Sequence, residues 1–130
     1  MAKPENSFIS GVHKYVQAYA MKNHNEYVGG VADCWYSGHV RDLWVEYKFI
    51  VVPKRDSTMI VPELSPLQLQ WLTERRSEGR HMWVVIGCKE GGVMMCRPPE
   101  WKTGVNAATF RERVVTRAQL ANAIDTFVSK

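Results

Sequence analysis

The segment LWVEYKFI, residues 43–50, places two opposite charges inside a run of large apolar side chains. Its density of β-branched and aromatic residues favours a β-strand. Successive side chains of a strand point to opposite faces, so Glu46 and Lys48 share one face. Val45 and Tyr47 point the other way. The chain must therefore fold so that one face of this strand is buried while the other accommodates a carboxylate beside an ammonium group.

Hydrophobic spacing and turn residues predict the other elements. Apolar residues three and four positions apart predict a helix over about residues 5–22. Ser65 and Pro66 predict the start of a second helix, and Gly79 predicts its end. Thr116 and the apolar spacing after it predict a last helix over about 116–128. The expected strands lie at about 27–36, 43–52, 81–88 and 91–97, and the expected loops at 53–63 and 98–106.

The chain is expected to form one domain. Its 130 residues are 45% hydrophobic, which suits a single core, and no linker, repeat or low-complexity segment divides them. Helices and strands alternate along the chain, and this order predicts a central mixed β-sheet flanked by helices. The sequence therefore predicts a single α/β domain over residues 1–130.

Charge and cysteine content narrow the function classes. The 17 Lys and Arg exceed the 13 Asp and Glu, which is compatible with a polyanionic partner but does not require one. The three cysteines form no CxxC pair, and His24, His39 and His81 show no metal-ligand spacing, so neither a disulfide framework nor a zinc site is expected. The first residues lack the apolar core of a signal peptide, and no run of about 18 apolar residues occurs. We expect a cytoplasmic protein without a membrane partner.

The separation of Asp33 and Glu46 along the chain suits a β-hairpin. The turn-like residues 37–42 can fold one strand onto the next and bring Asp33 beside Glu46. Two carboxylates suit Mg²⁺ or Mn²⁺, which activate water and accept phosphate oxygens, and a nearby lysine can stabilise charge on phosphorus. The alternative is that Glu46 and Lys48 form the solvent face of an amphipathic strand. Asp33 would then be an ordinary turn residue.

The order of motifs along the chain resembles a known superfamily. An amphipathic helix is followed by GGVAD (29–33), WVEYK (44–48), LSPLQ (64–68) and an apolar strand. This order resembles the PD-(D/E)XK nucleases. Within that superfamily it is similar to the small virus-type replication-repair (VRR-Nuc) nucleases and the Holliday junction resolvases. The resemblance covers about residues 5–90, and it departs from the family pattern at Ala32, where the family usually has proline.

The resemblance implies a fold and a set of site residues. The implied fold is a restriction-endonuclease-like core in the order αβββαββα, with the motifs inside about residues 5–96. The implied roles are metal ligands, a catalytic lysine, a supporting glutamine and a further acid from the first helix. The matching residues are Asp33, Glu46 and the backbone carbonyl of Tyr47 for the metal, Lys48 for catalysis, Gln68 for support, and Glu5 as the further acid. Glu5 can equally be a solvated residue at the start of a helix.

Some basic residues are candidates for contact with DNA phosphates. Lys54 and Arg55 are the first choice, because their loop follows the Glu46–Lys48 strand directly. His13 and Lys14 on the first helix are weaker candidates. For each of these residues, an ordinary solvated surface position is the alternative.

The resemblance implies a metal-dependent endodeoxyribonuclease that uses Mg²⁺ or Mn²⁺ to hydrolyse phosphodiester bonds. The expected partner is DNA, either duplex or branched, and the similarity to the resolvases implies branched DNA and a homodimer. The small size and compact motif set of the chain resemble phage-encoded members, which act in the cytoplasm of the bacterial host. Two alternatives stay open. One is a nicking or restriction-like endonuclease on the same fold, and the other is a non-catalytic nucleic-acid-binding phage protein.

Overall fold

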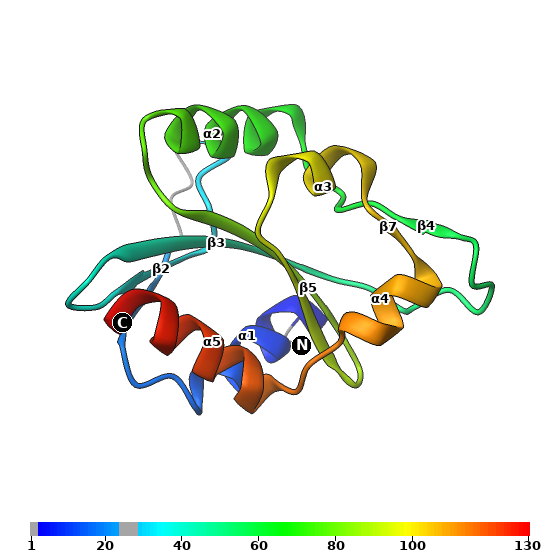
Figure 1. The fold of residues 1–130 in the computed structure, drawn as a ribbon, viewed down its shortest axis with the longest axis horizontal. Coiled ribbons are helices and arrows are strands. Elements are labelled where there is room, and N and C mark those ends of the chain that lie inside the picture. The colour runs from blue at the N-terminus through cyan, green and yellow to red at the C-terminus, as the bar shows by residue number, and fades with distance from the viewer. Residues whose placement is uncertain (1–2, 24–28) are drawn as a thin grey trace.

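A five-stranded mixed β-sheet lies between two layers of helices (Figure 1). The computed structural model describes residues 3–23 and 29–130. One face of the sheet is covered by α1 (Pro4–His13) and α5 (Arg117–Ser129). The other face is covered by α2 (Pro66–Ser77) and α3 (Pro98–Thr103). This architecture confirms the predicted α/β class with a central sheet flanked by helices.

The order of strands in the sheet is β1-β2-β3-β5-β6. Only β3 and β5 pair in parallel, and the other neighbours pair antiparallel. The strands of this sheet are β1 (Tyr19–Lys22), β2 (Cys34–Ser37), β3 (Asp42–Phe49), β5 (Met82–Cys88) and β6 (Gly91–Met95). A small second sheet pairs β4 (Met59–Ile60) with β7 (Val105–Asn106), and α4 (Ala107–Arg113) follows it.

The parallel pairing of β3 with β5 requires a crossover, and the crossover contains α2. The register sets Glu46 opposite Val84 and Lys48 opposite Ile86. Because paired residues share a face of the sheet, the two charged side chains lie on the face that α2 crosses. The fold therefore brings the start of α2 over the charged residues of β3.

Strand β3 separates two hydrophobic cores. Val45 and Tyr47 are fully buried in the core between the sheet and helices α1 and α5. The second core, on the α2 and α3 face, contains Val84 and Ile86 of β5. The prediction that Glu46 and Lys48 lie on one face of this strand, and Val45 and Tyr47 on the other, is therefore confirmed. The charged side chains point toward the second core, beneath α2.

The predicted helix over residues 5–22 is wrong in its second half. Helix α1 ends at His13, and Tyr19–Lys22 forms the edge strand β1, paired antiparallel with β2. The carboxylate of Asp125, on α5, accepts the backbone N–H groups of Gln17 (2.9 Å) and Ala18 (2.9 Å). These donors are satisfied by a residue more than 100 positions away, so helical spacing alone could not reveal the break.

The predicted strand over residues 27–36 is confirmed only near its end. The structure assigns β2 to Cys34–Ser37, and residues 24–28 lie outside the described residues. Strand β3 also ends at Phe49, earlier than the predicted residue 52. Counting β1 as the first strand, the main sheet and its helices keep the predicted order αβββαββα, with β4 and the α3-β7-α4 segment inserted.

The loop predicted at residues 98–106 is wrong, because it contains α3 and β7. Two prolines suggested a break, but they occupy the first turn of α3, where a missing N–H is tolerated. Trp101 is buried there, and its ring nitrogen donates to the carbonyl of Met95 at 2.9 Å. The side chain of Asn106 caps α4 by accepting from the N–H of Thr109 at 2.8 Å. The loop predicted at 53–63 likewise contains the short strand β4.

The starts of the other two helices agree with the sequence. Ser65 and Gln68 form a reciprocal capping box at α2, and Thr116 and Gln119 form one at α5. Within residues 3–23 and 29–130, no helix combines the length and apolar character needed to cross a bilayer.

The ring of Phe8 packs against the backbone of β5 and β6 where glycines leave room. A Cβ atom added at Gly87 would lie 2.7 Å from this ring. We expect Gly87→Ala to lower the free energy of unfolding by about 1–3 kcal/mol, because the buried ring has to shift. Urea denaturation followed by tryptophan fluorescence measures this change.

Gly29→Ala is the matched control, because its Cβ would meet only the tip of the exposed Leu67 side chain, at 3.0 Å. We expect this variant to change the free energy of unfolding by less than about 0.5 kcal/mol. Equal destabilisation by the two variants would contradict the proposed fit of Phe8 against β5.

Candidate active site

Asp33 lies beside Glu46, as the hairpin geometry predicts. In the β2–β3 register Cys34 is opposite Val45, so Asp33 directly precedes the paired residues. Its carboxylate oxygen Oδ2 accepts the backbone N–H of Tyr47 at 2.9 Å. This bond fixes one oxygen of Asp33 against β3.

The side-chain amide of Gln68 connects Glu46 to Lys48. Its Nε2 donates to Oε2 of Glu46 at 3.0 Å, and its Oε1 accepts from Nζ of Lys48 at 3.1 Å. The same Oε1 also accepts the backbone N–H of Ser65 at 2.9 Å, which is one half of the capping box. Lys48 Nζ lies 3.6 Å from Glu46 Oε2. Because Gln68 is the third residue of α2, the start of the helix itself holds the two charged side chains in place.

Glu46 is the most unusual side chain of this cluster, because only 2% of its surface is exposed. Burial, followed by the nearby charge of Asp33, raises the pKa of Glu46 to about 8, although Lys48 opposes the shift. Its oxygen Oε1 is buried without a hydrogen-bond partner among the described residues. A buried carboxylate oxygen without a partner is costly, unless a cation or water binds it.

Glu5 brings a third carboxyl group to the same place. It lies in the first turn of α1 and is half-buried. Burial, followed by the charge of Asp33, raises the pKa of Glu5. Glu5 in turn contributes to the raised pKa of Glu46. The N-terminus of α1 therefore adds negative charge beside the Asp33–Glu46 pair.

These donors fit a hard divalent cation. Among residues 3–23 and 29–130, no three His, Cys, Asp or Glu side chains are already arranged as a metal-binding group. Mg²⁺ and Mn²⁺ do not require such a cage, because one or two carboxylates and several waters suffice. The unpartnered Oε1 of Glu46, next to Asp33, is where the protein offers such a ligand. The role of the Tyr47 carbonyl stays a prediction. The Tyr47 side chain is buried on the opposite face, with its hydroxyl 2.6 Å from that of Tyr36.

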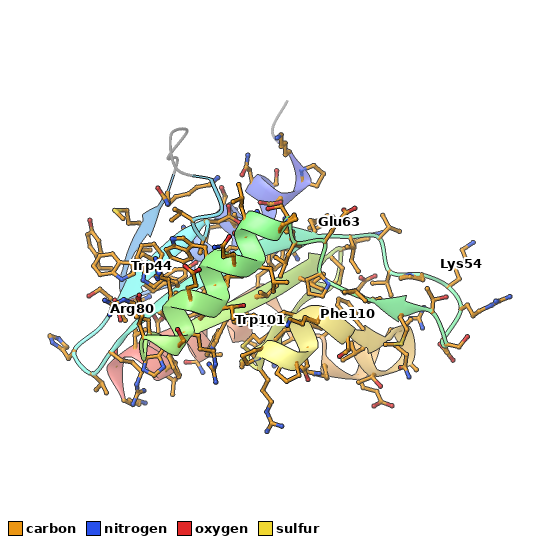
Figure 2. All side chains as sticks on the ribbon, turned by 90° about the horizontal axis from the view of Figure 1, so that it is seen from above. Trp44, Lys54, Glu63, Arg80, Trp101 and Phe110 are labelled. Carbon is orange, nitrogen blue, oxygen red and sulfur yellow. The ribbon has the colours of Figure 1, made fainter. Side chains whose placement is uncertain are left out.

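The predicted phosphate contacts lie apart from this cluster. His13 is half-buried, with Nε2 2.7 Å from the hydroxyl of Tyr36, and burial lowers the pKa of His13. Lys14 is exposed where α1 ends. Lys54 and Arg55 are exposed on the loop between β3 and β4, and Figure 2 shows Lys54 at the tip of that loop, far from the start of α2. The predicted roles of all four residues in DNA contact stay predictions.

A cavity that the sequence did not suggest opens next to Lys48. Its volume is about 550 Å³. The residues that line it include Glu5, Lys48, Pro62 and Glu63. Glu63 carries no motif and lies in a stretch predicted as loop, so no local signal could have identified it.

Comparison with known proteins gives matches among solved structures and not among family models or curated sequences. No protein-family model matches the chain, and no curated protein sequence matches it. Among solved structures, the chain is similar to Hjc, a Holliday junction resolvase from the archaeal hyperthermophile Archaeoglobus fulgidus. The TM-score is 0.57 and the identity 15%, over 92% of this chain and 97% of that chain. This chain has the same fold. At such low identity the likeness extends to the fold alone, so the VRR-Nuc resemblance and the phage origin stay predictions.

The pKa of Glu46 predicts a pH-dependent stability. The folded protein binds a proton at Glu46 more tightly than the unfolded chain, whose reference pKa is 4.5. Glu46 therefore makes its full contribution to the free energy of unfolding below pH 4.5, and this contribution is lost as the pH rises toward about 8. Since a glutamine side chain cannot ionise, the melting temperature of Glu46→Gln minus that of the parent should increase from about pH 5 to about pH 8.5. Thermal denaturation of both proteins in EDTA, at several pH values, measures this difference in melting temperature.

Glu112→Gln on α4 is the control, because Glu112 is exposed. We expect its difference from the parent to stay constant over the same pH range. A difference for Glu46→Gln that is equally flat would mean that the buried carboxyl does not bind its proton more tightly in the folded state.

Proposed function

We propose that this protein is a divalent-metal-dependent endodeoxyribonuclease that hydrolyses phosphodiester bonds in branched DNA. The observation that carries the proposal is the bridge from Gln68 to Glu46 and Lys48, with Asp33 beside it. An acid pair and a lysine, held together on one sheet face, suit phosphodiester hydrolysis. The fold shared with a Holliday junction resolvase supports branched DNA as the substrate.

In this proposal each side chain has a separate task. A bound Mg²⁺ or Mn²⁺ supplies a water of lowered pKa and offsets negative charge on the phosphate. Asp33 and Glu46 hold the cation. The N–H of Tyr47 orients Asp33, and the amide of Gln68 orients Glu46 through Oε2, whereas Oε1 has no hydrogen-bond partner in the described part of the chain. The ammonium group of Lys48 stabilises the charge that develops on the phosphate oxygens.

Further parts of the proposal rest on the family resemblance. They are the homodimer and the action in the cytoplasm of a phage-infected bacterial host. A homodimer would place two sites on one branched substrate, which suits paired incisions. Nicking and restriction-like activities would use the same side chains, so only the substrate preference separates them from a resolvase.

The central prediction is metal-dependent cleavage that needs Lys48 and Glu46. We expect the parent protein to cut a four-way junction with Mg²⁺ or Mn²⁺ but not in EDTA. Lys48→Ala and Glu46→Gln should each reduce the rate about 100-fold or more, because the first removes a positive charge beside the phosphate and the second weakens the binding of the cation. Gel assays on the junction, a linear duplex, single strands and a supercoiled plasmid measure the rates.

Lys89→Ala and Glu112→Gln are the matched controls, since both residues are exposed and lie in the β5–β6 turn and on α4, respectively. We expect both to cut at the parental rate. Paired incisions in the junction select a resolvase, and relaxation of the plasmid alone selects a nickase. Binding of DNA without any cleavage would select the non-catalytic alternative and refute the nuclease proposal.

The loop that carries Lys54 and Arg55 is anchored to α4. Arg111 donates to the carboxylate of Asp56 at 2.6 Å and to the carbonyl of Pro53. The backbone N–H of Ala108 donates to the carbonyl of Asp56 at 3.1 Å. The loop therefore presents its two exposed cations in a defined position, which favours contact with a DNA backbone.

We expect the double variant Lys54→Ala/Arg55→Ala to bind DNA more weakly, because two phosphate contacts are lost. The slope of log K against log salt should become shallower by about 1.8, which is about 0.9 for each contact. Fluorescence anisotropy at several salt concentrations measures the slope. Lys89→Ala/Lys102→Ala removes the same charge at two other exposed positions. An equal change in slope would show that only net charge matters.

A further inference from the structure

The cavity beside Lys48 has the size of a small-ligand pocket and two chemically different parts. Its volume of about 550 Å³ falls within the range of about 300–1,000 Å³ typical of such pockets. Ile50 and Val61 supply apolar surface, whereas Glu5 and Glu63 supply carboxylates. The cavity shares Lys48 and Glu5 with the candidate active site, so a group inside it lies next to the reacting phosphate.

The backbone at Glu63, whose side chain is exposed, connects to Lys48 through the start of α2. Glu63 is the central residue of a tight turn in which the N–H of Leu64 donates to the carbonyl of Pro62 at 2.9 Å. The backbone N–H of Ser65 then donates to the same Gln68 oxygen that accepts from Lys48. Figure 2 shows Glu63 beside the first turn of α2. The turn, the helix cap and the lysine therefore form one connected structure.

The lining of the cavity is unsuited to a second phosphate group. Two carboxylates face a single ammonium group there, so an anion would meet net negative charge. A flat, largely apolar ring with an N–H donor fits better, because apolar side chains can contact its faces and Glu63 can accept its hydrogen bond. Carboxylates accept from the exocyclic amino groups of nucleobases in this way. A stacked base in a duplex cannot enter a cavity, whereas an unpaired base can.

We propose that this cavity receives one unpaired nucleobase next to the scissile phosphate, and that Glu63 accepts a hydrogen bond from its exocyclic amino group. The inference rests on the proposed nuclease function and specifies its substrate, namely DNA with an unpaired nucleotide at the point of cleavage. Adenine, cytosine and guanine carry the required amino group, and thymine does not. A bulge or a flap offers such a nucleotide, whereas a fully paired four-way junction has to open a base pair at its branch point.

Duplexes that differ in one unpaired nucleotide test the proposal. We expect an unpaired cytosine at the cleavage position to be cut about tenfold faster than an unpaired thymine or an abasic site. In Glu63→Gln the preference for cytosine over thymine should disappear, because an amide can both donate and accept. The rate on the abasic substrate should stay unchanged. Single-turnover rates give all three comparisons.

A second variant fills the cavity without replacing a charged residue. Val61 is 45% exposed, so Val61→Trp can place its ring in the cavity without disturbing the core. We expect this variant to cut the cytosine and abasic substrates at equal rates. A binding measurement that needs no cleavage accompanies it. The Asp33→Asn protein should increase the fluorescence of an unpaired 2-aminopurine, and Asp33→Asn/Val61→Trp should not.

Equal parental rates on the cytosine, thymine and abasic substrates would overturn the proposal, and so would unchanged 2-aminopurine fluorescence. Equal slowing of all substrates by Glu63→Gln, relieved by more Mg²⁺, would also overturn it, because Glu63 would then be a metal ligand. If the protein cuts no DNA, the proposed function fails. The fluorescence experiment then still decides whether the cavity binds an unpaired base.

Discussion

The side-chain amide of Gln68 is the contact on which the candidate site depends. One amide completes the cap of α2, orients Glu46 and holds Lys48. A helix cap is a local structure, whereas the pairing of α2 with β3 requires the crossover between two parallel strands. Gln68 therefore belongs both to the cap of α2 and to the charged cluster, and the turn that contains Glu63 leads directly into this cap.

The position of β3 between two cores explains why Glu46 is buried and why its carboxyl group lowers the stability of the folded protein. Val45 and Tyr47 anchor the strand in the core under α1 and α5, so Glu46 has to point toward α2. There it is buried near Asp33 and Glu5, and one of its oxygens has no partner within the described part of the chain. Such a cluster costs stability in the folded protein, and a bound cation would relieve that cost. Catalytic sites commonly contain ionisable groups whose pKa is shifted by burial and by nearby charges.

Whether an element could be predicted from the sequence depends on how far apart along the chain the interacting residues lie. The capping boxes at Ser65 and Thr116 were predictable because each involves residues three positions apart. The break after His13 was not, because the backbone donors that follow α1 are satisfied by Asp125 at the other end of the chain. Helix α3 was missed because its two prolines suggest a break unless their place in the first turn is known.

The sequence by itself determined the two faces of residues 43–49 and the start of α2, because side-chain alternation and helix capping are set by neighbouring residues. It also placed Asp33, Glu46, Lys48 and Gln68 in an order that resembles a nuclease family. Only the tertiary structure decided that Gln68 bridges Glu46 and Lys48, and that Glu63 lines the same cavity as Lys48. These contacts join β3 to residues about 15–22 positions later, and the parallel pairing of β3 with β5 is what brings them together.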